Sequence, residues 1–555
     1  MGMRLRIALL MIAIAGPATS QTQPSLQLQG QPYFGGNMTL HLTGAVGQPA
    51  LVAFGLDPLT TPIQTGKGPW YIGSLVNLVP LGSVPASGRI DVAFTMPPLM
   101  PAFIGIPIAL QGYIPPALTN PATLGLDEPY LLARGVTVIE NPLPSEQALF
   151  GDSMAAGDFN GDGAVDLAVG AWFEDVAGAD KAGCVYVMWG PGFSAFTRLE
   201  PTAPVLNLHF GLGLVAADFD GDGVADLGVG QGTGGDPPLN SHAFIFIYQG
   251  SANFPSAPSV TATSAGTGQS AYIFGRIVRA GDLNDDGWPD LAVGAPDAMV
   301  NGLDRAGRIE VFYGPSLDAP LLIENPEPKV NDFFGSRLSL CDMTGDGVTD
   351  IVEASGRAKV GTISQAGRVH VYDGPTLSLL KTIDNPAPAA NDRFGEGLTA
   401  ADLEGDGQSE IVVADVKKNV YVVWNSMSAT TISASSKPPT PNPTSAATSF
   451  GYFFATSDAN GDGLTDIVIA DPFEGDVTGC GVLSAGGSIY FALAPYFSTY
   501  LRLSNPMGAC GDEFSWNLVA VDLDGDLVEE FVAGDDTADV GGVSNAGCVI
   551  LVTRY

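Results

Sequence analysis

The sequence has little positive charge and few of the residues that bind nucleic acids or transition metals. Its 555 residues include 23 Lys and Arg against 59 Asp and Glu, for a formal net charge of −36, with five cysteines and four histidines. Such an acidic chain is a poor partner for nucleic acid or for an anionic membrane surface. The histidines, His41, His209, His242 and His370, share no metal-ligand spacing.

Motifs of common catalytic sites are also missing. The chain contains no Gly-x-Ser-x-Gly, no His-Glu-x-x-His and no Gly-x-x-x-x-Gly-Lys-Ser/Thr. Long amphipathic helical patterns are scarce as well, whereas glycine (71) and proline (42) are abundant. This composition favours an all-β chain with many turns.

Two apolar runs are present, and neither predicts a membrane-spanning helix. Residues 1–20 combine a basic start, a nine-residue apolar run at 7–15 and small residues at 18–20, which is the pattern of a secretory signal peptide. The second run, 96–118, contains six prolines, which a spanning helix does not accommodate. We therefore expect a chain without a transmembrane anchor that is secreted, periplasmic or held at the cell surface.

One acidic pattern of nine residues, clearest at 282–290, recurs along the chain. Oxygen-bearing side chains occupy positions 1, 3, 5 and 9, and a glycine at position 6 permits a tight turn. This is the ligand rhythm of a hard cation such as Ca²⁺. A phenylalanine lies eight residues before every copy, and the seven copies begin at Asp158, Asp218, Asp282, Asp342, Asp402, Asp458 and Asp522.

The candidate calcium ligands are the side chains at positions 1, 3, 5 and 9 and the main-chain carbonyl at position 7. They are Asp158, Asn160, Asp162, Ala164, Asp166, Asp218, Asp220, Asp222, Val224, Asp226, Asp282, Asn284, Asp286, Trp288, Asp290, Asp342, Thr344, Asp346, Val348, Asp350, Asp402, Glu404, Asp406, Gln408, Glu410, Asp458, Asn460, Asp462, Leu464, Asp466, Asp522, Asp524, Asp526 and Glu530. Thr344 is a neutral ligand, Glu404 and Glu410 are longer than aspartate, and the seventh loop has Leu527 in place of the glycine. Up to seven Ca²⁺ ions are expected, and ligand-free Asx turns are the alternative.

Each repeat of about 60 residues contains four short strand patterns. Seven such repeats over 133–555 predict a seven-bladed β-propeller, whose blades are four-stranded sheets. Because the last repeat supplies only three strands, we expect 136–140 to pair with 548–553 and close the ring. Residues 21–132 do not share the repeat, and their period-two alternation predicts a small β-sandwich-like module.

The repeat resembles the FG-GAP repeats of the integrin α-chain propeller and of many secreted bacterial proteins. The motif is Phe-Gly, then the acidic loop, then Gly-Ala-Pro, as in Phe274-Gly275, 282–290 and Gly294-Ala295-Pro296. The resemblance implies that the innermost strand follows Phe-Gly and that calcium lies between the first two strands on one face. It also implies that ligand and partner contacts come mostly from the opposite face.

The resemblance bears on the cysteines too. The family topology places Cys480 and Cys510 on the same face, and we predict a disulfide between them in an exported protein. Cys341 occupies an inner-strand position and is expected to be a buried, inert thiol. Cys184 and Cys548 occupy matching places in the first and last repeats, and their pairing stays an open alternative.

Two functions are weighed. The first is a non-catalytic extracellular binding or adhesion module for a protein or glycan, whose contact face is lined by 171–181, 231–241, 295–305 and 354–365. The alternative is a polysaccharide-binding lectin or a polysaccharide-degrading lyase or hydrolase. A cluster of basic and aromatic residues on one face would favour the alternative. The sequence shows candidates, Trp172, Lys181, Arg305 and Arg337, that are few and scattered along the chain.

Overall fold

The computed structural model divides into two compact units, Met1–Leu131 and Leu132–Tyr555. The described residues of the first unit are 25–30, 37–43, 49–65, 68–83, 89–95, 108–114, 117–118 and 122–124. Those of the second are 135–232, 243–266, 273–417, 419–424, 432–436, 449–459, 464–474, 486–492, 494, 500–505, 512–523 and 529–553. The predicted signal peptide lies outside these ranges.

The first unit contains strands in two sheets. A three-stranded sheet has the order β1-β2-β5, and a second sheet has the order β4-β3-β6-β7 with β8 paired to β6. The strands are β1 (Ser25–Gly30), β2 (Asn37–Thr43), β3 (Pro49–Thr65), β4 (Gly68–Ser83), β5 (Arg89–Thr95), β6 (Ile108–Ile114), β7 (Ala117–Leu118) and β8 (Ala122–Leu124). Part of the apolar run 96–118 is therefore strand, which agrees with the expectation that its prolines exclude a spanning helix. Across the described residues, no helix has the length and apolar character needed to cross a membrane.

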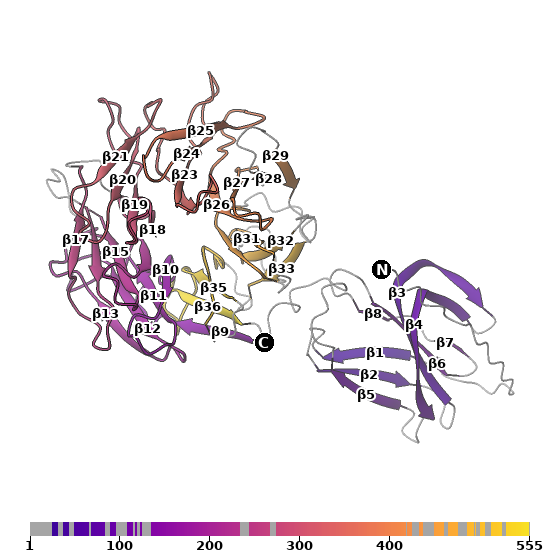
Figure 1. The fold of residues 1–555 in the computed structure, drawn as a ribbon. Coiled ribbons are helices and arrows are strands. Elements are labelled where there is room, and N and C mark those ends of the chain that lie inside the picture. Colours follow the sequence, from indigo (N-terminus) through magenta and orange to yellow (C-terminus); the bar gives the residue numbers. More distant parts are fainter. Residues whose placement is uncertain are drawn as a thin grey trace. The chain divides into compact units, whose positions relative to one another are not determined.

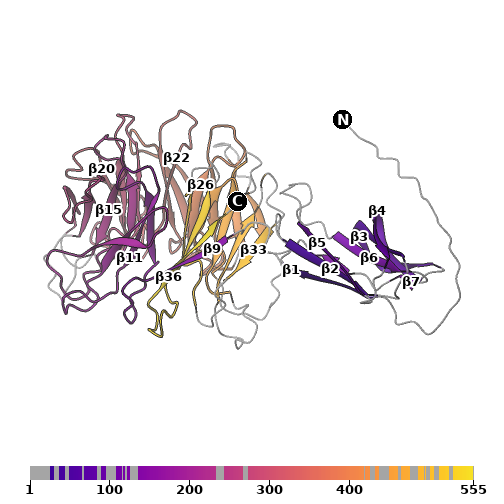
Figure 2. The ribbon, with the colours of Figure 1, turned by 90° about the horizontal axis from the view of Figure 1, so that it is seen from below.

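The second unit is a seven-bladed β-propeller, which confirms the predicted fold of this region (Figures 1 and 2). Each blade is a four-stranded antiparallel sheet. The first three blades are β10 (Ser153–Gly157), β11 (Asp166–Ala171), β12 (Cys184–Trp189), β13 (Ala195–Leu199); β14 (Leu214–Ala217), β15 (Asp226–Gln231), β16 (Phe244–Tyr248), β17 (Val260–Thr263); and β18 (Val278–Gly281), β19 (Asp290–Ala295), β20 (Arg308–Phe312), β21 (Leu321–Glu324).

The remaining four blades follow the same order from the centre outward, and the last takes its outer strand from the start of the unit. Blades four and five are β22 (Leu338–Cys341), β23 (Asp350–Ser355), β24 (Arg368–Tyr372), β25 (Leu379–Asp384); and β26 (Gly397–Ala401), β27 (Glu410–Ala414), β28 (Asn419–Val423), β29 (Ile432–Ser436). Blades six and seven are β30 (Phe454–Ser457), β31 (Asp466–Asp471), β32 (Ser488–Ala492), β33 (Tyr500–Ser504); and β34 (Asn517–Val521), β35 (Glu530–Asp535), β36 (Cys548–Thr553), β9 (Gly135–Glu140).

The repeated phenylalanines lock neighbouring blades together. All seven are at most 2% exposed. In blade four, Gly367 just before the third strand pairs with Phe394 of the next repeat in an isolated parallel bridge. Its φ is +92°, and a Cβ there would lie 2.0 Å from the carbonyl oxygen of Phe394. Only glycine fits so close a backbone contact, which explains the Ala-Gly before the third strand.

The same contact closes the ring between blade seven and blade one. A Cβ on Gly547 would lie 2.1 Å from the carbonyl oxygen of Phe150. Strand β9 pairs antiparallel with β36 over the full register from Cys548 opposite Glu140 to Thr553 opposite Gly135. This is the pairing that the incomplete last repeat predicts, and it removes two open sheet edges.

The thiols in the described part of the chain are unbridged. Cys184, Cys341 and Cys548 are free; Cys184 and Cys548 are buried, whereas Cys341 is only partly buried. Desolvation raises the pKa of all three, that of Cys341 to about 12, so each stays protonated at neutral pH. The predicted partners Cys480 and Cys510 lie outside the described residues.

Ring closure is tested by polar substitutions on β9. Ile139 is 7% exposed and packs with Val549 and Leu551, whereas Val136 on the same strand is 42% exposed. We expect Ile139→Asp to lower the free energy of unfolding by about 3 kcal/mol, because it buries an unpaired charge and removes an apolar contact. Val136→Asp is the matched control and should change stability little. Equal melting temperatures for the two variants would show that the seam does not depend on β9.

Candidate metal loops and a central cavity

Each acidic loop lies between the first two strands of its blade, and the five that are described in full are organised by their first aspartate. In the first loop, Asp158 Oδ1 accepts from the main-chain N–H of Gly161 at 2.7 Å and of Asp162 at 3.1 Å. Its Oδ2 accepts from the N–H of Gly163 at 2.8 Å, where φ is +86°. The turn therefore folds around one carboxylate, and the glycine at position 6 is required by its backbone conformation.

The acid at position 9 is a brace that sequence reasoning missed. Asp166 is fully buried; one oxygen accepts from Phe159 N–H at 2.9 Å and the other from Gly190 N–H at 2.8 Å, beyond the third strand. Asp226, Asp290 and Asp350 repeat this arrangement with Gly250, Gly314 and Gly374. Each carboxylate oxygen keeps a second lone pair, so bracing and metal binding are compatible. The constant offset of 24 residues to the glycine was the available signal.

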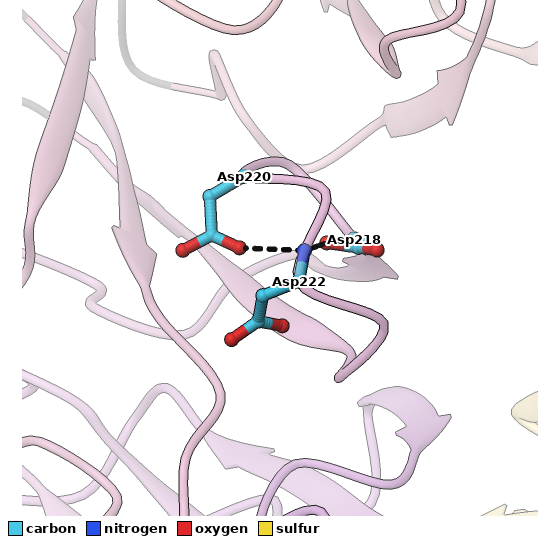
Figure 3. Close-up of side chains that lie close together, drawn as sticks. All are labelled: Asp218, Asp220 and Asp222. Carbon is cyan, nitrogen blue, oxygen red and sulfur yellow. Dashed lines mark hydrogen bonds between the residues drawn. The ribbon is translucent and has the colours of Figure 1, made fainter.

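The second loop shows the clearest metal geometry. Carboxylate oxygens of Asp218, Asp220 and Asp222 lie within 4.8 Å of one another (Figure 3). The main-chain N–H of Asp222 donates to Asp218 Oδ1 at 3.1 Å and to Asp220 Oδ1 at 3.2 Å, which holds the triad together. Three carboxylates in so small a space repel one another, and a hard divalent cation with oxygen ligands fits this donor set.

The fifth loop gives a second indication that a cation is accommodated. Glu410 is fully buried, and its Oε2 accepts from Leu403 N–H at 3.0 Å. Its Oε1 has no hydrogen-bond partner. Burial, together with the nearby charges of Glu404, Asp406 and Asp402, raises the pKa of Glu410 to about 7. An orphaned carboxylate oxygen among three other acids is a position that a cation would satisfy.

The remaining loops are placed as follows. Loops one and three have the backbone bonding of loop two, with Asn160 and Asn284 at position 3. In loop four, Thr344 Oγ1 lies 3.4 Å from Asp342 Oδ1, so position 3 turns toward position 1. Residues 460–463 of loop six and 524–528 of loop seven lie outside the described ranges, including the candidates Asn460, Asp462, Asp524 and Asp526. Asp458, Asp466, Asp522 and Glu530 are described, and the two closing acids are buried.

A cavity of about 600 Å³ lies at the opposite end of the blades, where the seven innermost strands begin. Its lining comes from all seven repeats and includes Arg276, Arg279, Arg337 and Arg357. Antiparallel pairing places the acidic loops at the far ends of the same strands. The cavity is therefore remote from the acidic loops, and its lining combines these arginines with the acids Asp152 and Glu396.

The structure corrects the expectation that basic and aromatic residues are scattered. The Arg276 guanidinium lies 5.4 Å from the Trp172 ring centroid, and that of Arg337 lies 5.0 Å from the Tyr452 ring. Lys181 stacks on Phe173 at 4.4 Å, and Arg305 approaches Phe333 at 6.0 Å. Repeats distant in sequence bring these groups to one end, so their clustering was not visible along the chain.

A buried acidic group lies beside the cavity at the seam of the ring. Asp536 is 3% exposed and its Oδ1 has no hydrogen-bond partner. Burial raises its pKa, and the charges of Asp152 and Glu513 raise it further. Burial likewise raises the pKa of Asp535 to about 8 and that of Glu513 to about 6. Asp152 accepts a hydrogen bond from Trp516 Nε1 and lies 3.6 Å from Arg276.

Two protein-family models match segments of this chain that contain the repeats described above. The FG-GAP repeat matches residues 274–312, and the FG-GAP-like repeat matches 158–229 and 402–469. Together these regions contain eleven complete strands and acidic loops one, two, three, five and six.

Curated relatives share parts of the chain. Phosphatidylinositol-glycan-specific phospholipase D of Homo sapiens is 28% identical over 390 residues, which is 62% of this chain and 45% of that protein. The Rattus norvegicus protein of the same name is 31% identical over 154 residues, 25% of this chain and 18% of that protein. Integrin alpha-IIb of Homo sapiens is 36% identical over 169 residues, 28% of this chain and 16% of that protein. The chain thus spans less than half the length of these relatives.

The fold and its loops define a seven-bladed β-propeller with an acidic loop between the first two strands of each blade. The chain is an FG-GAP repeat protein, related to the N-terminal propeller of integrin alpha chains and to phosphatidylinositol-glycan-specific phospholipase D. The resemblance inferred from the sequence is confirmed.

Calcium binding is tested by two neighbouring substitutions in loop three with the same charge change. Asp286 occupies position 5, whereas Asp285 occupies position 4 and is exposed with φ +58°, which asparagine tolerates. We expect Asp286→Asn to weaken one Ca²⁺ site by about tenfold or more, because it removes a ligand charge. Asp285→Asn should leave the titration unchanged. Isothermal titration of the chelator-stripped chain measures both, and equal losses would show general electrostatics in place of a defined site.

The seam acids predict a pH dependence of stability. Their pKa values are raised in the folded state, so their contribution is complete below the unfolded pKa near 4 and is lost as pH rises through the folded values, about 8 for Asp535. Asp536→Asn should therefore raise the free energy of unfolding at pH 8 by about 1–3 kcal/mol and flatten its fall between pH 5 and 8. Asp539→Asn, an exposed acid of the same loop, is the control. Identical pH profiles for the wild type and Asp536→Asn would contradict this account.

Proposed function

We propose that this chain is an extracellular, calcium-stabilised propeller that acts as a non-catalytic binding or adhesion module. The observation that carries the proposal is the difference between the two ends of the blades. Acidic loops with cation-ligand geometry gather at one end, and a cavity lined by basic and aromatic residues opens at the other. Such a division leaves one end for a structural metal and the other for a partner.

In this proposal the acidic loops hold up to seven Ca²⁺ ions. A bound ion would neutralise carboxylates that otherwise repel one another, and the position-9 acids would transmit that stability to the third strand through their backbone bonds. Because the unfolded chain has no preformed cage, binding raises the stability of the fold.

The proposed contact face is the end that carries the loops between the second and third strands. Loops 171–181, 295–305 and 354–365 are described, and most of 231–241 is not. Blade five has a shorter loop there than blade one, because only residues 415–418 separate β27 from β28, whereas 172–183 separate β11 from β12. The partner would be an extracellular protein or a glycan. The chain would reach it after export directed by the signal peptide at residues 1–20. We also propose that the two N-terminal sheets pack as a β-sandwich-like module over 21–132, since β1 contacts β6 and β8.

The second candidate is a polysaccharide-binding lectin or polysaccharide-degrading enzyme. The cluster of arginines and aromatic rings in the cavity favours carbohydrate over a purely mechanical role. A relative that is named as a phospholipase D matches this chain over less than half of its own length. We assign the chain binding without catalysis.

The test is a binding screen of the full chain with calcium on a glycan array and on immobilised extracellular matrix proteins. Each hit is followed for bond cleavage by product chromatography. We expect saturable binding without cleavage that is lost when the loops at 171–181, 295–305 and 354–365 are shortened to the length of 415–418. The control shortens the turn 191–194 between β12 and β13, at the end of the acidic loops, and keeps Gly190 as the partner of Asp166. Binding that survives the shortened loops would point to the N-terminal unit, and cleavage would establish the enzyme.

A further inference from the structure

The lining of the cavity is the part of the propeller that does not repeat. Every repeat keeps its buried phenylalanine, yet two residues after it the seven repeats hold seven different residues. All seven line the cavity: Asp152, Leu212, Arg276, Ser336, Glu396, Tyr452 and Trp516. A sevenfold structural need would favour one residue at this position. The variation therefore indicates an asymmetric surface that faces a ligand without sevenfold symmetry.

Three of the arginines in this cavity form no ion pair within the described part of the chain, although the charge of Arg357 acts on Asp297 and lowers the pKa that burial raises there. Among the described residues, no carboxylate forms an ion pair with Arg279, Arg337 or Arg357, although the chain contains 59 acids. Arg337 Nη1 and Arg279 Nη1 donate only to main-chain carbonyls, at 3.0 and 2.8 Å, and Arg337 Nε is buried without a partner. Such guanidinium groups are ready to accept an anion.

The surroundings of Arg279 show that this positive charge carries a cost. Its side chain lines the cavity and is exposed there. Desolvation by the surrounding protein lowers the pKa of Arg279, and the charge of Arg337 lowers it further. The two acids that do line the cavity already have partners: Asp152 bonds Trp516 and lies near Arg276, and Glu396 lies 4.0 Å from Arg393.

Aromatic rings form a cluster next to these charges, in which Phe453 packs edge to face against Tyr452 and Trp516. The ring centroids of Tyr452 and Trp516 lie 5.6 Å apart, and those of Phe453 and Trp516 lie 6.0 Å apart. All three side chains are half-buried, and Arg337 lies over Tyr452 and Phe453 at 5.0 and 5.9 Å. Flat apolar faces beside cationic groups suit a ring that carries both C–H faces and a negative substituent.

We propose that this cavity binds an acidic oligosaccharide, with Arg279, Arg337 and Arg357 receiving its carboxylate or sulfate groups and Tyr452, Phe453 and Trp516 stacking on its sugar rings. The volume of about 600 Å³ falls within the range of small-ligand pockets and favours a few sugar residues over a folded partner surface. The inference rests on the proposed binding function and specifies its ligand class.

The experiment measures binding of defined oligosaccharides to the full chain with calcium by isothermal titration. The probes are oligogalacturonate, which carries carboxylates, a heparin-derived oligosaccharide, which carries sulfates, and neutral cello-oligosaccharide of matched length. Poly-glutamate is the acidic-peptide probe. We expect at least one acidic glycan to bind at least tenfold more tightly than the neutral one, with affinity that falls as salt rises. The stronger of the two acidic glycans identifies the anionic group.

Variants then assign the site. Arg279→Gln and Arg337→Gln should each weaken acidic-glycan binding at least tenfold, and both should keep or raise the melting temperature because they relieve repulsion between like charges. Lys329→Gln is the control with the same change of charge: this lysine is at the same end, does not line the cavity and lies 3.8 Å from Glu327, which does not line it either. Trp516→Ala removes one of the aromatic rings proposed to stack on the sugar and should also weaken acidic-glycan binding, with circular dichroism as the check on folding.

Three outcomes overturn the inference. They are equal affinity for neutral and acidic glycans, unchanged affinity in Arg279→Gln and Arg337→Gln, and binding of poly-glutamate with none of either acidic glycan. Each leaves the proposed binding function intact if the loop-shortened chain still loses a partner found in the wider screen. If that screen finds no partner but an acidic glycan binds in the cavity, the proposed contact face on the loops would be wrong and the proposed cavity site would stand.

Discussion

The contact on which the propeller depends joins five of the seven repeated phenylalanines to the glycine before the third strand of the preceding blade. The ring is fully buried, and the backbone at that glycine approaches so closely that a Cβ would lie 2.0–2.3 Å from the next phenylalanine's carbonyl oxygen at Gly183, Gly307, Gly367, Gly487 and Gly547. This interlock fixes where each innermost strand starts. As a result all acidic loops fall at one end of the ring and all strand starts at the other.

The acidic loops show how a chain with a formal charge of −36 tolerates its charge. Much of it sits at loop positions 1, 3, 5 and 9, where the first carboxylate accepts backbone N–H groups and the last is buried between loop and third strand. Burial of these closing acids raises the pKa of Asp226 and Asp290 to about 6. The fold thus holds carboxylates in a state that neutralisation by a cation would relieve.

Much of this architecture was available from the sequence, because it is written in features that repeat. The spacing of Phe150 and its six counterparts, the loop pattern and the unpaired strand at 136–140 predict the number of blades and the closing pair. The brace made by Asp166 was missed, since its partner Gly190 lies 24 residues away and looks like an ordinary turn glycine. The N-terminal strands vary in length and β3 pairs with β4 through several register shifts, so their alternation predicts strands without specifying how two sheets pack.

The cavity could not be predicted for the opposite reason. Most of its residues lie within the few positions after the phenylalanine of different repeats, so Arg279 and Trp516, more than 200 residues apart, are brought to one cavity only because the ring gathers all seven strand starts. Read along the chain, each is a single deviation from the consensus of its repeat. In a closed repeat fold, the positions that hold the ring together must be alike in every blade, whereas a ligand on the axis meets each blade differently. Deviations among the residues that line the axis are therefore where recognition is encoded, and here they combine positive charge with aromatic surface in a chain otherwise dominated by acids.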